Sequence, residues 1–154
     1  MYGVSNLADE PLERNEFEVF FQPEVNVSNG AIVGVEALLR WYCDGEMQDA
    51  ATFVPLAEET GLIVPIGRWV LSEAVRHGLR WIEWSGNEDF IVRVNVSPRQ
   101  FDDDGFIDHV ETTLRESGLP PQQLCLEITE TALMGDAESA VALLNRLDAL
   151  GIQL

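Results

Sequence analysis

The chain has 154 residues, and 27 acidic side chains against 9 basic ones give it a formal net charge of −18. All 9 basic residues are arginines, which excludes a catalytic lysine within this sequence. Such an acidic chain is a poor match for polyanions, so we expect no DNA partner. The length and a hydrophobic content of 46% predict one folded domain with a buried core.

The sequence contains neither a membrane-spanning segment nor a secretion signal. No apolar run approaches the roughly 20 residues that a membrane helix needs, and the N-terminus lacks a basic start followed by an apolar block. Cys43 and Cys125 are too far apart for a metal motif, and we expect free thiols. We therefore expect a cytoplasmic domain over residues 12–154, preceded by a polar lead or linker over residues 1–11, in a parent protein that another domain could anchor to a membrane.

Two strands are expected near the start of the domain. Residues 17–27 predict a strand in which Gln22 lies on the face opposite the apolar side chains. Those apolar residues of one face are Phe17, Val19, Phe21, Val25 and Val27. A Ser-Asn-Gly turn then leads into a second strand over residues 31–41, and so short a connection predicts an antiparallel hairpin.

Helix and strand patterns alternate after this hairpin. Thr52 is expected to cap a helix that begins at Phe53, tolerates Pro55 in its first turn and ends at Gly61. Further helices are expected over about 66–84, 106–117 and 137–150, and further strands over 90–97 and 124–129, with another beginning at 152–154. This order predicts an α/β fold with a parallel sheet, as either an open doubly wound sheet or part of a (β/α) barrel.

Polar residues interrupt one face of three expected strands near their carboxyl ends. They are Glu36, Asn95 and Glu127. Each alone could be a solvated residue or an ion-pair partner. Together they indicate a site, because the carboxyl ends of neighbouring parallel strands meet where ligands bind. Two carboxylates and an amide are hard oxygen ligands, which suit Mg²⁺ or Mn²⁺.

Other kinds of catalytic site are less well supported. His77 and His109 lie within expected helices, where they are better explained as surface or half-buried residues. No glycine-rich phosphate loop follows any expected strand. Arg40 shares the face of Glu36 and could either bind a phosphate beside the metal or form an ion pair at the rim.

Five segments of the sequence resemble one family in their residues and their order. These segments are FFQPEV, VGVEALLRW, FVPLAEETGLI, NVS and LEITET. They are similar to the EAL family of cyclic di-GMP phosphodiesterases, and the resemblance extends from about Leu12 to Leu154. It implies the first half of an EAL-type (β/α)₈ barrel, a TIM-like barrel whose first strand is antiparallel.

The resemblance also implies a reaction and a set of site residues. The family hydrolyses cyclic di-GMP to linear pGpG with two Mg²⁺ or Mn²⁺ ions, in bacterial signalling that regulates biofilm formation and motility. By this resemblance, Glu36 and Glu127 are catalytic, and Glu36, Asn95 and Glu127 bind metal. Arg40 contacts a substrate phosphate. The remaining family positions are Gln22, Leu38 and Glu58, which line the substrate groove, and Glu130, which stabilises a loop.

The family pattern continues beyond the residues of this chain. After a segment like LDALGIQL it has Asp-Asp-Phe-Gly, then a lysine and a later glutamate and glutamine, so we expect residues 1–154 alone to be inactive. The segment 42–45 also lacks the family's usual His-Pro. A non-catalytic cyclic di-GMP receptor or interaction module is the alternative. The resemblance further implies a homodimer of the complete protein and a possible GGDEF or sensory domain in the parent chain.

Overall fold

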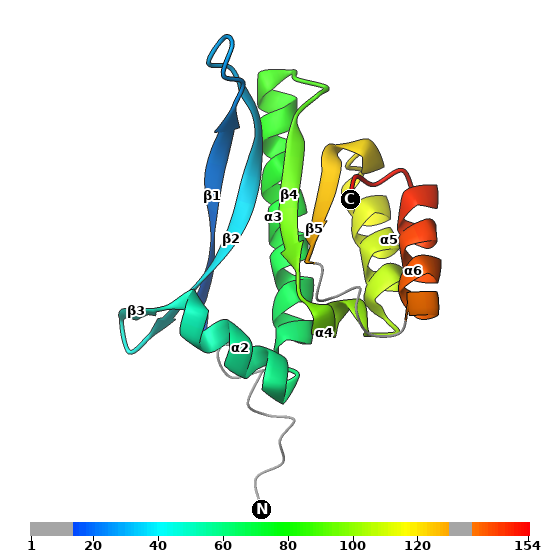
Figure 1. The fold of residues 1–154 in the computed structure, drawn as a ribbon. Coiled ribbons are helices and arrows are strands. Elements are labelled where there is room, and N and C mark those ends of the chain that lie inside the picture. The colour runs from blue at the N-terminus through cyan, green and yellow to red at the C-terminus, as the bar shows by residue number, and fades with distance from the viewer. Residues whose placement is uncertain (1–13, 130–136) are drawn as a thin grey trace, which may run out of the picture.

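The computed structural model describes residues 14–129 and 137–154, which form a mixed sheet with helices (Figure 1). Glu130 and the expected lead over residues 1–11 lie outside the described residues. The strands are β1 (Phe17–Val25), β2 (Ile32–Cys43), β3 (Glu46–Gln48), β4 (Ile91–Val96) and β5 (Leu124–Ile128). The helices are α2 (Ala50–Thr60), α3 (Ile63–Ser85), α4 (Pro98–Phe101), α5 (Phe106–Ser117), the 3₁₀ turn η2 (Pro121–Gln123) and α6 (Ala137–Ala149).

The strands pair in the order β1-β2-β4-β5, with β3 beside β2. Strands β1 and β2 are antiparallel, whereas β2, β4 and β5 are parallel, which confirms the predicted hairpin and parallel sheet. Beyond β5, Gln153 accepts from the amide of Leu126 and donates to the carbonyl of Leu124, both at 2.9 Å. This parallel bridge is the start of the strand expected at residues 152–154.

A β-bulge alters the end of the first strand. The register of β1 against β2 shifts between Glu24 and Val25. The shift leaves Val33 of β2 without a partner, so the extra residue is in β2 and the alternation of β1 continues. Val25 keeps the parity of Phe17 but is 54% exposed, and Val27 lies beyond the end of β1 and is 98% exposed, so the expected strand over residues 17–27 is two residues too long.

The segment that departs from the family pattern forms a second hairpin. Asp44 and Gly45 have φ values of 53° and 81°, and they join β2 to β3. An Asp-Gly pair favours this kind of tight turn because both positions require positive φ. The Asp-Gly pair was thus a sequence signal for the hairpin that contains β3, although no strand was predicted there.

Helix α2 begins earlier than expected. The side chain of Asp49 accepts from the amide of Ala51 at 3.1 Å, so Asp49 is the N-cap. The prediction that Thr52 caps the helix was wrong, since Asp caps as well as Thr does and the alanines after it extend the helix. Pro55 therefore lies inside the helix rather than in its first turn. Gly61 ends α2 with φ of 80°, as predicted.

The hydrophobic core lies between one face of the sheet and the helices. Figure 1 shows α3 running behind the strands, with α5 and α6 beyond β5. The inward side chains of β4 and β5 are almost fully enclosed: Val92, Val94, Leu124 and Leu126 are at most 2% exposed. Helix α3 approaches β4 closely at Gly78, where a Cβ atom would lie 2.2 Å from a methyl group of Val92. No helix of the described part is both long and apolar enough to cross a membrane.

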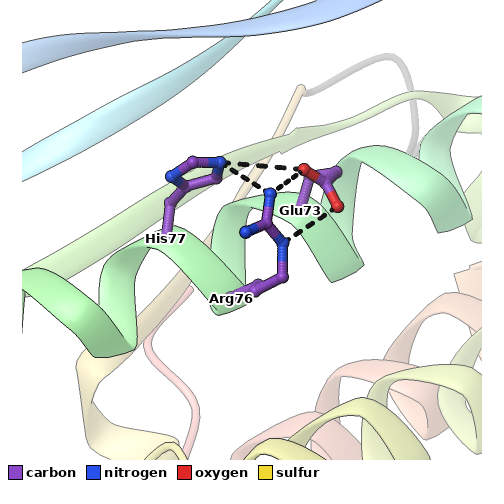
Figure 2. A network of polar contacts seen from close by, with 3 residues as sticks. All are labelled: Glu73, Arg76 and His77. Atoms are coloured by element: carbon purple, nitrogen blue, oxygen red, sulfur yellow. Dashed lines mark hydrogen bonds and ion pairs between the residues drawn. The ribbon is translucent and has the colours of Figure 1, made fainter. Parts of the chain in front are cut away.

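Helix α3 also carries a polar network on its side toward β1. Figure 2 shows Glu73, Arg76 and His77, in which Arg76 Nε donates to Glu73 Oε1 at 3.1 Å. The imidazole of His77 also lies against Phe21 and Trp81, with ring centroids 5.2 and 5.7 Å apart. Burial, followed by the charge of Arg76, lowers the pKa of His77, and the hydrogen bond from Arg76 lowers the pKa of Glu73.

These shifts predict a loss of stability at acidic pH. A depressed folded-state pKa means that the unfolded state binds the proton more readily, so stability falls as pH drops below about 6.5 for His77 and below about 4.5 for Glu73. The variant His77→Gln should lose less stability between pH 7.5 and 5.5 than the parent chain. Urea denaturation at the two pH values measures this, and equal losses in both proteins would contradict it.

Candidate ligand and metal site

A row of polar side chains crosses four strands on the sheet face opposite the helices. In the strand registers Gln22 of β1 lies opposite Glu36 of β2, and Asn95 of β4 lies opposite Glu127 of β5. The amide nitrogen of Asn95 also donates to Glu36 Oε1 at 2.8 Å, which links β4 to β2. The fold thus brings together four of the residues that the sequence singled out.

The polar side chains face away from the helices because the apolar residues next to them in each strand face toward the helices. Successive side chains of a strand point to opposite faces of a sheet. Val35 and Ala37 flank Glu36, Val94 and Val96 flank Asn95, and Leu126 precedes Glu127. All five of these apolar residues are buried. Because these apolar side chains occupy the face that packs on the helices, the polar side chains lie on the opposite face of the sheet.

A cavity of about 450 Å³ opens between the ends of β2 and β4 and helices α2, α3 and α4. Four predicted residues line it: Leu38, Arg40, Glu58 and Asn95. Gln22, Glu36 and Glu127 do not line it, so the structure places them in the adjoining polar row. Much of the remaining wall is apolar, which is typical of a pocket for a flat organic ligand.

Arg40 is held at the rim of this cavity by two contacts. Its Nη1 donates to the carbonyl of Leu39 at 2.8 Å, and its guanidinium carbon lies 5.5 Å from the ring centre of Phe20. Phe20 is 45% exposed on the same face, where it lies opposite Leu38 in the register. Phe20 was not among the predicted site residues. An aromatic side chain on the polar face of a strand was the feature of the sequence that could have indicated it.

An ion pair lies beside the polar row, toward the amino ends of the parallel strands. Arg93 Nε donates to Glu24 Oε2 at 2.7 Å, and its Nη1 lies 3.1 Å from the sulfur of Cys125. Glu24 reaches Arg93 across Gly34, where a Cβ atom would lie 3.1 Å from Glu24 Oε2 and only 2.5 Å from the carbonyl oxygen of Ile91. The contact therefore depends on a glycine at position 34.

The contacts of Arg93 also affect the pKa values of Arg93 and Cys125. The hydrogen bond to Glu24 raises the pKa of Arg93. Burial raises the pKa of the Cys125 thiol, an effect that nearby Arg93 partly opposes. Cys125 is thus a buried thiol at neutral pH, in agreement with the expectation of free cysteines.

The donor set of the polar row fits part of a hard-metal site. Within residues 14–129 and 137–154, no group of three or more His, Cys, Asp and Glu side chains could hold a metal ion. The row instead offers the carboxylates of Glu36 and Glu127 and the amide oxygen of Asn95. Such oxygens suit Mg²⁺ or Mn²⁺, although the roughly six ligands that Mg²⁺ takes require additional donors.

A family model described as the EAL domain matches residues 5–154. The chain therefore belongs to the EAL domain family, as its motifs predicted. Among curated proteins it is 42% identical over 142 residues to the bifunctional diguanylate cyclase/cyclic di-GMP phosphodiesterase MucR of Pseudomonas aeruginosa. It is 35% identical over 146 residues to the signaling protein YkoW of Bacillus subtilis. These matches cover 92% and 94% of the chain but only 21% and 18% of the two relatives.

Solved structures share the fold. The PaMucR phosphodiesterase in complex with c-di-GMP matches 97% of the chain with 40% identity and a TM-score of 0.87. The FimX EAL domain from Pseudomonas aeruginosa bound to c-di-GMP matches 99% with 26% identity and a TM-score of 0.80. The chain spans 60% of each of these structures. The described fold is thus part of an EAL barrel, with the antiparallel first strand that was expected.

The ion pair across Gly34 predicts a specific loss of stability. Glu24→Gln should destabilise the fold by about 1–2 kcal/mol, between the values for exposed and buried pairs, because Arg93 would lose its counter-charge. Glu18→Gln, an exposed position on the same face of β1, should change stability by less than about 0.5 kcal/mol. Chemical denaturation compares the two variants, and equal effects would argue against the ion pair.

Proposed function

We propose that this chain contributes part of the active site of a metal-dependent phosphodiesterase that hydrolyses cyclic di-GMP to linear pGpG. The observation that carries the proposal is the Glu36–Asn95 contact of 2.8 Å, with Asn95 and Glu127 paired near the carboxyl ends of β4 and β5 and next to a cavity. The match to MucR, whose name includes this activity, supports it.

In this proposal Glu36, Asn95 and Glu127 hold part of a two-ion Mg²⁺ or Mn²⁺ site, with Glu36 and Glu127 as the catalytic carboxylates. When bound, the metal ions stabilise the attacking and leaving oxygens of a phosphodiester. The hydrogen bond from Asn95 orients the Glu36 carboxylate. Glu36 and Glu127 come from β2 and β5, on either side of Asn95, and a divalent cation would offset their negative charges.

Substrate binding is assigned to the cavity. Arg40 is held over Phe20 and uses one guanidinium N–H on Leu39, so it retains donors for a phosphate. Leu38 and Glu58 form the wall for the rest of the dinucleotide. Gln22, which lies beside Glu36, binds at the edge of the groove.

The remaining expectations belong to the complete protein. We propose that residues 1–154 alone do not turn over cyclic di-GMP, because further acidic ligands and a lysine of the family pattern are not in this sequence. Glu130 is proposed to stabilise the loop after β5. We further propose a cytoplasmic domain that forms a homodimer, with a GGDEF or sensory domain in the parent chain.

A non-catalytic receptor is the second candidate. The structure of the FimX EAL domain bound to c-di-GMP shows that this fold can hold the dinucleotide. The cavity lies beside the carboxylate row rather than around it, so binding in the cavity would not by itself require the metal ligands. The receptor and the enzyme therefore differ in their dependence on metal.

Calorimetry and chromatography together test the proposal. We expect the chain to bind Mn²⁺ and cyclic di-GMP but to release no pGpG. Glu36→Gln and Glu127→Gln should each weaken Mn²⁺ binding by about tenfold or more, because each removes an anionic ligand. Glu116→Gln, at an exposed position on α5, serves as the control.

Each outcome of this experiment has a separate meaning. Metal-dependent turnover by residues 1–154 would contradict the expected inactivity. Unchanged Mn²⁺ affinity in both carboxylate variants would contradict the metal site and favour the receptor. Absence of cyclic di-GMP binding by the folded chain would contradict both candidate functions.

A further inference from the structure

Two glutamines are the buried polar residues of the described part of the chain. Gln100 is 6% exposed and Gln123 is 3% exposed. The amide nitrogen of Gln123 donates to the carbonyl of Glu88 at 2.9 Å and to that of Asn87 at 3.5 Å. Gln123 therefore has a structural explanation, since a buried amide requires partners.

Within the described residues, the side-chain oxygen of Gln100 has a hydrogen-bond partner and its side-chain nitrogen has none. It forms a capping box with Ser97, in which Oε1 accepts from the amide of Ser97 at 3.2 Å and the amide of Gln100 donates to Ser97 Oγ at 3.3 Å. Because the box fixes which end of the side-chain amide is the acceptor, Nε2 is the end that points elsewhere. Among the described residues, no hydrogen bond is donated by Gln100 Nε2.

Gln100 lies in the wall of the candidate substrate cavity. It packs directly on the backbone of α3 at Gly67, where a Cβ atom would lie 1.8 Å from Nε2. Gln100 and Gly67 both line the cavity of about 450 Å³ that also contains Leu38, Arg40 and Glu58. Among the described residues, Arg68 Nε is the one side-chain nitrogen or oxygen that is both fully buried and without a hydrogen-bond partner. Gln100 Nε2 is therefore partly accessible.

We propose that Gln100 Nε2 donates a hydrogen bond to a base of the bound dinucleotide and selects guanine over adenine. This inference rests on the proposed function. Guanine presents O6 and N7 as two adjacent acceptors, whereas adenine carries an amino donor at the position of O6. A fixed N–H donor in a largely apolar wall therefore favours guanine and leaves the amine of adenine facing another donor.

A purely structural role makes a different prediction. A space of about 10 Å³ on the other side of Gln100, also bounded by Gly67 and Arg68, is near the smallest that holds one water molecule. A water there would satisfy Nε2 without any ligand. Gln100 would then serve only the capping box and the core, and the choice of base would not depend on it.

The variant Gln100→Glu separates these roles. A glutamate keeps an oxygen for the amide of Ser97, since Glu and Gln serve equally in a capping box, but it replaces the donor with an acceptor. Competition against a fluorescent cyclic di-GMP gives the affinities of the chain for cyclic di-GMP and cyclic di-AMP. Because the two ligands carry the same phosphate charge, repulsion by the new carboxylate cancels in their ratio.

We expect Gln100→Glu to lower the preference for cyclic di-GMP over cyclic di-AMP by about tenfold or more. Gln123→Glu is the matched control, since it places the same substitution at the other buried glutamine. It should reduce thermal stability by removing the donor to Glu88 but leave the preference unchanged. An equal preference in the parent chain and Gln100→Glu would overturn the proposal.

Two further results complete the test. If circular dichroism shows that Gln100→Glu does not fold, Gln100→Met removes the donor without adding charge, and it should lower the preference in the same direction. An unchanged preference in the folded Met variant would also overturn the proposal. A parent chain that binds neither dinucleotide would overturn the proposed function with it, whereas binding with an unaltered preference overturns the role of Gln100 alone.

Discussion

The site depends on the register of three parallel strands, which pairs Asn95 with Glu127 and sets Glu36 opposite Arg93, so that all of these side chains lie on one face and Asn95 reaches Glu36 diagonally. Since side chains alternate between the two faces of a sheet, a slip of one residue in any strand would turn its polar member toward the helices. The apolar residues on the other face prevent such a slip. Val92 and Leu126 are fully enclosed, and Gly78 lets α3 pack directly on β4. The packing of the core thus fixes the positions of the polar side chains on the opposite face of the sheet.

Much of the fold could be predicted because its patterns are local. Helix α5 has the predicted bounds, and the polar interruptions of the strands lie on one face, since both rest on simple periodicity. Three features were not predicted because each involves a choice between local alternatives. Asp49 and Thr52 are both suitable caps, the register of β1 against β2 skips Val33, and the Asp-Gly turn adds β3. In each case neighbouring structure decides between options that the sequence leaves open.

The polar contacts of the site were harder to predict than its residues. The partners Glu24 and Arg93 are 69 residues apart and meet only because Gly34 leaves the path between them open. The capping-box pattern of Ser97 and Gln100 can be found in the sequence. The direction of the remaining amide, however, depends on the approach of α3 at Gly67. Such contacts follow from tertiary packing, which a single sequence does not specify.

The antiparallel first strand has a mechanical consequence. Because β1 runs against β2, its amino-terminal end lies at the same edge of the sheet as the carboxyl ends of the parallel strands (Figure 1). The chain therefore enters the sheet at Phe17 close to the mouth of the cavity, and the first rungs of the β1–β2 ladder include the residues opposite Arg40 and Leu38. Phe17 is itself part of the hydrophobic core, where its ring packs against Trp41 and Phe53. A force or rotation applied to the chain at Phe17 therefore acts on the core and on the β1–β2 ladder beside Arg40 together. The point where the chain enters the sheet is thus coupled directly to the rim of the cavity.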